Sequence, residues 1–252
     1  MLRRVMPGAL AAALLLPVAA EAQTLSSFEP PRPASRVLIA PYGGYIFGVT
    51  RSEETFVLTG TDAYFAEHDV ELGGGAVVGA VADIRVVGPF SLHAGGAYAK
   101  RGQTRHYVSE APDVYFTQEG SDVLFLKAGI GLHLMESISE LQRRSLSGTL
   151  FVAPLYMRDS PREEVEHNGE TLGESEAWGV NFGFDGQLPI TTRVAFQFGA
   201  EDYVVWWDEE ELTRWADAFW DLSLGQPGAT EVSVGASHNF LVRLGLSFTL
   251  LQ

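Results

Sequence analysis

Two serine–histidine pairs are the residues of this sequence whose spacing could support nucleophilic chemistry. Ser91 lies two positions before His93, and Ser137 lies four positions after His133. A serine nucleophile needs a base within hydrogen-bond reach and a further group that orients the base. Neither pair is flanked by a motif that would supply this third group, so we predict that the chain is not an enzyme.

Carboxylates are concentrated in two polar segments, 158–176 and 207–237. Their oxygens are of the kind that binds Ca²⁺ or Mg²⁺, but neither segment has the spacing of an EF-hand loop. We therefore interpret both segments as solvated acidic loops and predict neither a metal site nor a cofactor. The carboxylates concerned are Glu163, Glu164, Glu166, Glu170, Glu174, Glu176, Asp208, Glu209, Glu210 and Glu211.

Further charged residues lie on segments whose pattern predicts β-strands. In the final segment, 240–252, large apolar side chains occupy the even positions from Phe240 to Leu250. The odd positions are mostly small or polar and include Arg243. Successive side chains of a strand point to opposite faces, so this segment has one apolar and one polar face. About ten residues with this alternation are typical of a transmembrane β-barrel strand.

The whole chain divides into eight such strand segments. Their approximate bounds are 36–48, 74–86, 90–101, 122–134, 144–157, 177–189, 192–206 and 240–252. The connections between them alternate long and short, which is the arrangement of outer-membrane barrels with short turns at one end and long loops at the other. We predict an all-β fold, an eight-stranded antiparallel up-and-down transmembrane β-barrel.

Three long connections, 49–72, 102–121 and 158–176, are predicted as loops, and 55–59 could extend a strand. In the fourth, 207–237, apolar residues recur at helical spacing, which predicts a short amphipathic helix. Pro154 has no N–H for a strand ladder, so we expect it near a strand end or at a bulge.

The orientation of the strands follows from the character of their two faces. A soluble barrel turns its apolar face inward and its charges outward. Here the less apolar face is rich in glycine, alanine and serine, which suits a narrow interior, and the aromatic-rich face suits lipid. Tyr98, Tyr156, Trp178 and Trp206 fall near strand ends, where an interfacial aromatic girdle is expected.

The charges on the inward face must be paired, because an unpaired buried charge costs several kcal/mol. Depth along each strand places Lys127, Glu201 and Arg243 near mid-height, with Asp185 somewhat lower. We predict that these four residues form a polar network that plugs the interior; the alternative is a proton or ion path.

The first residues predict export from the cytoplasm. Residues 1–22 contain Arg3 and Arg4, an apolar run and a small-residue cleavage site, as in a signal peptide. We expect a periplasmic leader at 23–35, with three prolines, and the barrel at 36–252. The sequence has no cysteine and a net charge of −15, which argues against nucleic-acid binding.

The mature chain from about residue 36 resembles small outer-membrane β-barrel proteins of the OmpA-like class. The resemblance is carried by the eight-strand plan, by Glu201-Asp-Tyr203 and by the closing His238-Asn-Phe240 with Gly245-Leu-Ser-Phe248. It implies a bacterial outer-membrane protein that contacts outer-membrane lipid and is recognised by the outer-membrane assembly machinery through its C-terminal strand.

We expect a monomer with a structural or surface-interaction role. One alternative is a conduit or receptor for a small hydrophobic solute, in which Trp215, Phe219 and Trp220 would guide the ligand. Another is an outer-membrane enzyme that removes or transfers acyl chains of lipid A, for which the two serine–histidine pairs are the candidates.

Overall fold

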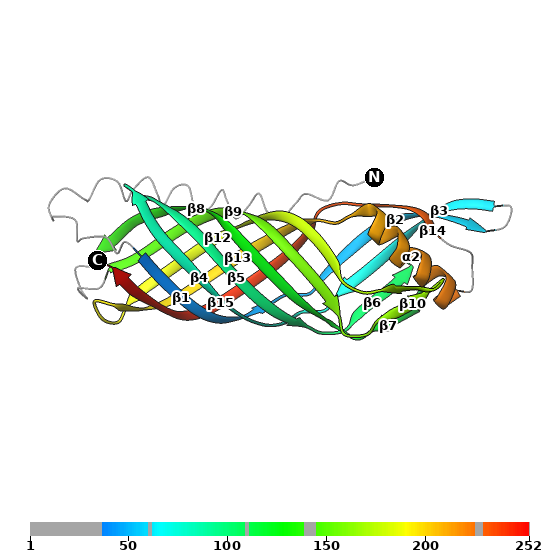
Figure 1. The fold of residues 1–252 in the computed structure, drawn as a ribbon, viewed down its shortest axis with the longest axis horizontal. Helices are drawn as coiled ribbons and strands as arrows, with labels where there is room; N and C mark the ends of the chain where they lie inside the picture. The colour runs from blue at the N-terminus through cyan, green and yellow to red at the C-terminus, as the bar shows by residue number, and fades with distance from the viewer. Residues whose placement is uncertain (1–36, 60–61, 109–110, 139–144, 225–228, 252) are drawn as a thin grey trace.

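The computed structural model describes residues 37–59, 62–108, 111–138, 145–224 and 229–251, and its main element is a closed barrel of eight antiparallel strands (Figure 1). The strands follow one another around the barrel in chain order, and β1 closes it by pairing with both β4 and β15. The predicted fold is therefore confirmed. Their bounds are β1 Val37–Ile46, β4 Gly75–Val87, β5 Phe90–Arg101, β8 Ser121–Ile138, β9 Ser145–Pro161, β12 Ser175–Pro189, β13 Val194–Trp206 and β15 Ser237–Leu251.

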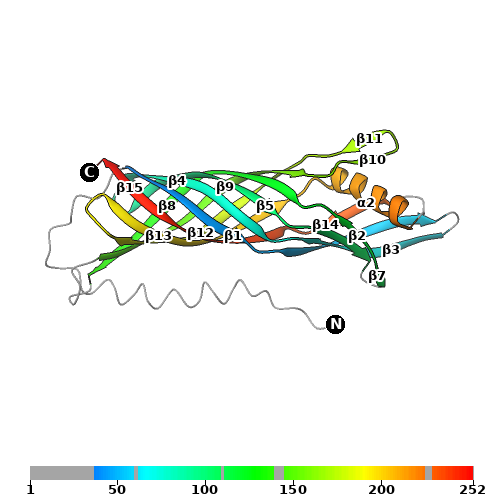
Figure 2. The same ribbon diagram turned by 90° about the horizontal axis from the view of Figure 1, so that it is seen from below.

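Short connections join β4 to β5 and β12 to β13 at one end of the barrel, which we call the turn end. The other end, which we call the cap end, carries the long connections, and Figure 2 shows them extending well beyond the barrel. Among the described residues, no helix combines the length and apolar character needed to cross a lipid bilayer.

The long connections are folded, so the prediction of three loops was wrong. Five strands form a separate sheet in the order β14-β2-β3-β6-β7, and β10 pairs with β11 in a small hairpin. Each of the first three connections forms a hairpin whose backbone groups pair across two strands, and β14 of the fourth connection pairs with β2. The alternation of apolar and polar residues does not reveal such strands, because these segments are polar. The bounds are β2 Val49–Thr59, β3 Asp62–Leu72, β6 Thr104–Val108, β7 Ala111–Gln118, β10 Val165–His167, β11 Glu170–Leu172 and β14 Ala229–Val234.

The helix expected in the last connection is present as α2, Glu209–Leu224. Asp208 caps its N-terminus, because the carboxylate accepts hydrogen bonds from the amides of Glu210 and Glu211 at 2.9 and 3.2 Å. The apolar face of α2 is buried against the five-stranded sheet and fixes the helix over the cap end. The residues in this cluster are Leu212, Ala216, Phe219, Trp220 and Val232.

The barrel strands turn alternate side chains in and out. On β15, Arg243 is 2% exposed while the neighbouring Leu244 is 59% exposed. The facing of β1, which the sequence leaves open, follows the same rule: Tyr42 and Ile46 point inward and Tyr45 outward.

The interior is layered along the strand direction. Polar side chains lie toward the turn end, charged ones at mid-height, and a hydrophobic layer separates these from the cap end. The sequence predicts a mainly small, polar interior and misses this hydrophobic layer. The large residues of the layer lie on strands whose outward-facing residues are also apolar, so the two faces of the strand look alike in the sequence. Members of the layer are Tyr42, Ile46, Val77, Phe125, Leu155, Met157, Tyr203, Val205 and Leu241.

Pro154 lies in the middle of β9, so the prediction that it marks a strand end or bulge was wrong. It pairs opposite Val180 on β12 in an uninterrupted register. On the β8 side, pairing passes from Lys127–Leu155 to Ile130–Val152, and no pair involves Pro154. The missing N–H is therefore accommodated by a local gap in one ladder, while the exposed ring faces outward.

Candidate functional site

The interior of the barrel brings together the four residues predicted to form a polar network. Lys127 on β8 donates a hydrogen bond to Glu201 on β13, and Arg243 Nε lies 2.6 Å from the other carboxylate oxygen of Glu201. Arg243 Nη2 also donates to Asp185 Oδ1 at 2.5 Å. Asn181, which the sequence argument did not single out, accepts from Lys127 at 3.0 Å.

Aromatic rings close the space around this network. The Lys127 ammonium lies 4.6 Å from the ring centroid of Phe151, and the Arg243 guanidinium lies 4.5 Å from that of Tyr42. Such contacts favour a cation that has lost its water. Two cations thus face two carboxylates between aromatic rings, and all four charged side chains are at most 6% exposed. Their side chains occupy the barrel axis at mid-height.

Nearer the turn end, Asp83 is the centre of a second polar cluster. Its carboxylate accepts a hydrogen bond from Ser91 at 2.9 Å and lies 2.9 Å from His133 and 3.5 Å from His93. This is not the geometry of a nucleophile, because the Ser91 hydroxyl donates to the carboxylate and not to an imidazole. The Ser137 side chain lies outside the described ones, so the second predicted pair cannot be placed.

The four predicted girdle residues lie on the outer surface toward the cap end. Trp178 stands directly opposite Tyr156 on one neighbouring strand and Trp206 on the other. Tyr156 and Trp178 are in edge contact at 5.2 Å between ring centroids. Tyr98 is on β5, and Tyr45 on β1 adds a further exposed ring. These rings lie on strands from both sides of the barrel, near the level at which it passes into the cap.

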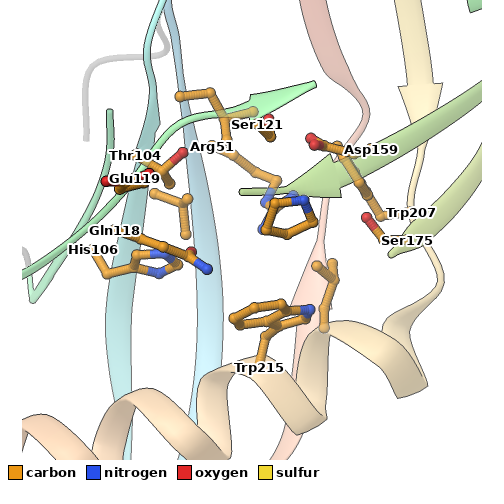
Figure 3. A pocket seen from close by; sticks show the side chains of 14 residues that line it. Arg51, Thr104, His106, Gln118, Glu119, Ser121, Asp159, Ser175, Trp207 and Trp215 are labelled. Atoms are coloured by element: carbon orange, nitrogen blue, oxygen red, sulfur yellow. The ribbon is translucent and has the colours of Figure 1, made fainter. Parts of the chain in front are cut away.

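A pocket opens at the cap end, between the barrel rim, the five-stranded sheet and α2 (Figure 3). Arg51 comes from β2, Asp159 from the end of β9, and Trp207 and Trp215 from the connection that contains α2. The Arg51 guanidinium lies 4.6 Å from the ring centroid of Trp207. Sequence reasoning missed this site, because its residues come from separate connections and only folding brings them together.

The wall of the pocket is fixed by polar contacts at the rim. Arg162 bridges Asp122 at 2.9 Å and donates to the carbonyl of Arg101 at 2.8 Å. Gln118 donates to the carbonyl of Glu163 at 3.0 Å. These contacts tie the segment that follows β9 to the ends of β5, β7 and β8 and so brace the rim of the barrel.

The acidic residues expected to be solvated have mixed roles. Glu174 lies on the surface and pairs with Arg158, whose guanidinium lowers the pKa of this carboxyl below its usual range. Partial burial raises the pKa of Glu211 on α2. His167 of the β10–β11 hairpin contacts Asp217 of α2 at 3.1 Å and so pins the hairpin to the helix. Among the side chains that the structure describes, no group of histidines and carboxylates has the arrangement of a metal site.

Comparison with known proteins gives no matching family model and no matching curated protein. Solved structures that the chain resembles include Neisserial surface protein A (8% identity, 87% of this chain and 100% of that chain, TM-score 0.43). The outer membrane protease OmpT from Escherichia coli is 11% identical (88% and 99%, TM-score 0.46). The outer membrane protein OprG from Pseudomonas aeruginosa is 12% identical (84% and 94%, TM-score 0.44). The resemblance to the OmpA-like class stays a prediction.

Proposed function

We propose that the chain is an integral outer-membrane barrel with a closed interior, which presents the folded cap as its interaction surface. The observation that carries this proposal is the outer face of the barrel. Large apolar side chains on all sides of a closed barrel are strongly exposed, with Val78 at 61%, Ile130 at 58% and Leu244 at 59%. Soluble monomers rarely expose apolar patches beyond a few hundred Å², whereas hydrocarbon would cover this band.

Closure of the barrel supports the same placement. Every barrel strand has a neighbour on both sides, so no open sheet edge would face lipid. The exposed rings of Trp178 and Trp206 would then lie at the interface, where amphipathic aromatic side chains are favoured. With the turn end in the periplasm, the cap lies outside the cell.

The interior supports a structural or surface role in preference to transport. The ion pairs at mid-height and the hydrophobic layer above them lie in series across the barrel, so an ion or solute would have to displace both. Phe219 and Trp220, suggested as guides for a hydrophobic solute, are at most 4% exposed and pack α2 onto the sheet. Only Trp215 of that trio lines the pocket.

Topology and location can be tested together in intact cells. A short epitope tag inserted between Asn168 and Gly169, at the tip of the β10–β11 hairpin, should be labelled by an antibody added outside. The same tag at Gly88, in the turn between β4 and β5, should be labelled only after the outer membrane is permeabilised. The protein should fractionate with the outer membrane and migrate faster on gels before boiling than after it.

Labelling at both positions, or recovery of the protein in the soluble periplasm, would contradict the proposal. Conductance in planar bilayers tests the closed interior separately. We expect no steady ion current from the native protein. A stable current that disappears in Glu201→Gln would support the alternative of an ion path.

A further inference from the structure

We propose that the pocket at the cap end binds one edge of a neutral sugar, either free or at the end of a surface glycan. The proposal rests on the pocket alone and does not depend on the surface role proposed above. In Figure 3, Asp159 and Ser121 lie on the barrel side of the pocket, and Trp215 rises from α2 on the opposite side.

Two buried polar groups of the pocket, the Asp159 carboxylate and the Ser121 hydroxyl, are incompletely satisfied. Asp159 is 7% exposed and Ser121 is 5% exposed, and both line the pocket. The Ser121 hydroxyl is placed to act as a donor toward Asp159, but Asp159 Oδ1 and Ser121 Oγ each lack a well-formed hydrogen bond to the described residues. A buried polar atom without a partner costs about 1–3 kcal/mol, and such atoms are rare in native proteins. A ligand that donates a hydrogen bond at this point would remove that cost.

The charges around the pocket favour a ligand that is itself neutral. Arg51 and Arg101 both act electrostatically on Asp159, and Arg101 is buried with Nε and Nη1 unpartnered. An additional cation at Asp159 would be opposed by these guanidinium groups, and an anion would be opposed by the Asp159 carboxylate itself. The exposed Glu119 at the pocket edge adds a second negative charge. A neutral hydroxyl donor meets neither opposition.

The remaining lining of the pocket divides into an apolar side and a polar side, and Arg51, His106 and Gln118 contribute to the polar side. Trp207, Trp215 and Leu212 present apolar surface on the helix side, while Thr104 and Ser121 add hydroxyl groups on the strand side. A ligand with an apolar face and a hydroxyl edge could pack against the helix side and form hydrogen bonds with the strand side. A sugar ring has this division, because its C–H groups are positively polarised toward the negative face of an indole.

The size of the pocket limits how much of the ligand enters. Its volume is about 60 Å³. A water molecule needs roughly 10–15 Å³ on this scale, so about five water-sized groups fit. This is less than a whole hexose, so one edge of the ring would enter and the rest would project outward. A terminal residue of a longer glycan fits the same description.

The test uses the full-length protein refolded in a detergent whose headgroup is not a sugar, since glycosidic detergents would compete. Methyl glycosides of glucose, galactose, mannose and N-acetylglucosamine are titrated by calorimetry and by saturation-transfer NMR. We expect at least one to bind with a Kd on the order of 1 mM. Asp159→Asn should weaken binding about tenfold, because it replaces a charged acceptor by a weaker neutral one. Trp215→Phe should also weaken binding about tenfold, because the smaller ring covers less of the apolar face of the sugar.

Two control variants make comparable substitutions near the pocket but outside it. Glu209→Gln changes an exposed carboxylate of α2 outside the pocket, and Trp206→Phe changes an indole on the outer surface. Both should leave binding within about twofold of the native value. Gel mobility before boiling reports whether each variant has folded. Should Asp159→Asn fail to fold, Trp215→Phe keeps the test decisive.

Three results would overturn the proposal: no neutral glycoside binds up to about 50 mM, binding is insensitive to both pocket variants, or choline or a sulfated sugar binds more tightly than every neutral glycoside. A second arm compares the best methyl glycoside with lipopolysaccharide oligosaccharide that ends in the same sugar. Tighter binding of the oligosaccharide identifies a glycan end as the ligand, and equal affinity identifies the free sugar.

Discussion

Glu201 is the residue at which the two cations of the barrel interior converge. Lys127 donates to one of its carboxylate oxygens, and Arg243 Nε lies 2.6 Å from the other. Glu201→Gln keeps the shape of the side chain and removes its charge, which leaves two buried cations facing Asp185 alone. Removing one partner of a buried ion pair costs about 3–5 kcal/mol, and we expect the free energy of unfolding to fall by this amount.

A compensating change distinguishes the loss of charge balance from other effects of the substitution. Lys127→Met in the Glu201→Gln background restores one cation, Arg243, opposite one carboxylate, Asp185. The double variant should therefore lose less stability than the two single variants together, with a coupling of about 2 kcal/mol. Glu174→Gln is the matched control, because it makes the same substitution at an exposed carboxylate that pairs with Arg158 at the cap end. Its loss should not exceed about 1 kcal/mol.

The assay is urea unfolding of the protein refolded into lipid vesicles, followed by tryptophan fluorescence, with gel mobility as the measure of barrel closure. Two results would refute the reasoning. One is a loss below about 1 kcal/mol in Glu201→Gln, which would place the carboxylate among ordinary surface positions. The other is strict additivity of the Glu201 and Lys127 losses, since independent charges do not form a network.

Three further predictions follow from the backbone, the outer face and the cap. A Cβ added at Gly44 would collide with the backbone of β15, so Gly44→Ala should prevent the barrel from closing, whereas Gly43→Ala, whose nearest atom lies at 3.9 Å, should give the native gel shift. Phe182→Arg should lower the free energy of unfolding by about 2–4 kcal/mol in lipid vesicles, because Phe182 is 47% exposed on the outward face; an unchanged value would contradict the membrane placement. His167→Ala removes the contact with Asp217, so amides of the β10–β11 hairpin should exchange hydrogen faster by mass spectrometry; equal exchange would show that this contact does not hold the hairpin.

The barrel was predictable because the pattern that specifies each of its strands lies within a few neighbouring residues. A strand between lipid and a narrow interior needs one apolar and one small or polar face, and segments such as β15 and β8 show this period directly. Placing Lys127, Glu201 and Arg243 at one depth required only counting along the strands. The contacts between these three side chains could then be expected, because a charged side chain at that depth of the barrel has few other groups to pair with.

The cap was not predictable to the same degree, because its strands are polar and its contacts join distant connections. One signal was nevertheless present. Asn168-Gly169 is the most favoured two-residue hairpin turn, and both residues have positive φ, 50° and 80°. This dipeptide predicts the β10–β11 hairpin from sequence alone. The pocket has no such local signal, because Arg51, Asp159 and Trp215 come from three separate segments.

The order of the layers along the barrel bears on what the pocket can do with its ligand. Below Asp159, β9 carries Met157 and Leu155 into the hydrophobic layer, and the ionic network lies deeper still. A hydroxylated ligand that moved inward would exchange its polar partners for apolar side chains and would then have to separate buried ion pairs. Leaving the polar partners and separating the ion pairs each cost several kcal/mol. A ligand at Asp159 is therefore held at the outer surface, which fits a receptor or adhesive site better than the entrance to a channel.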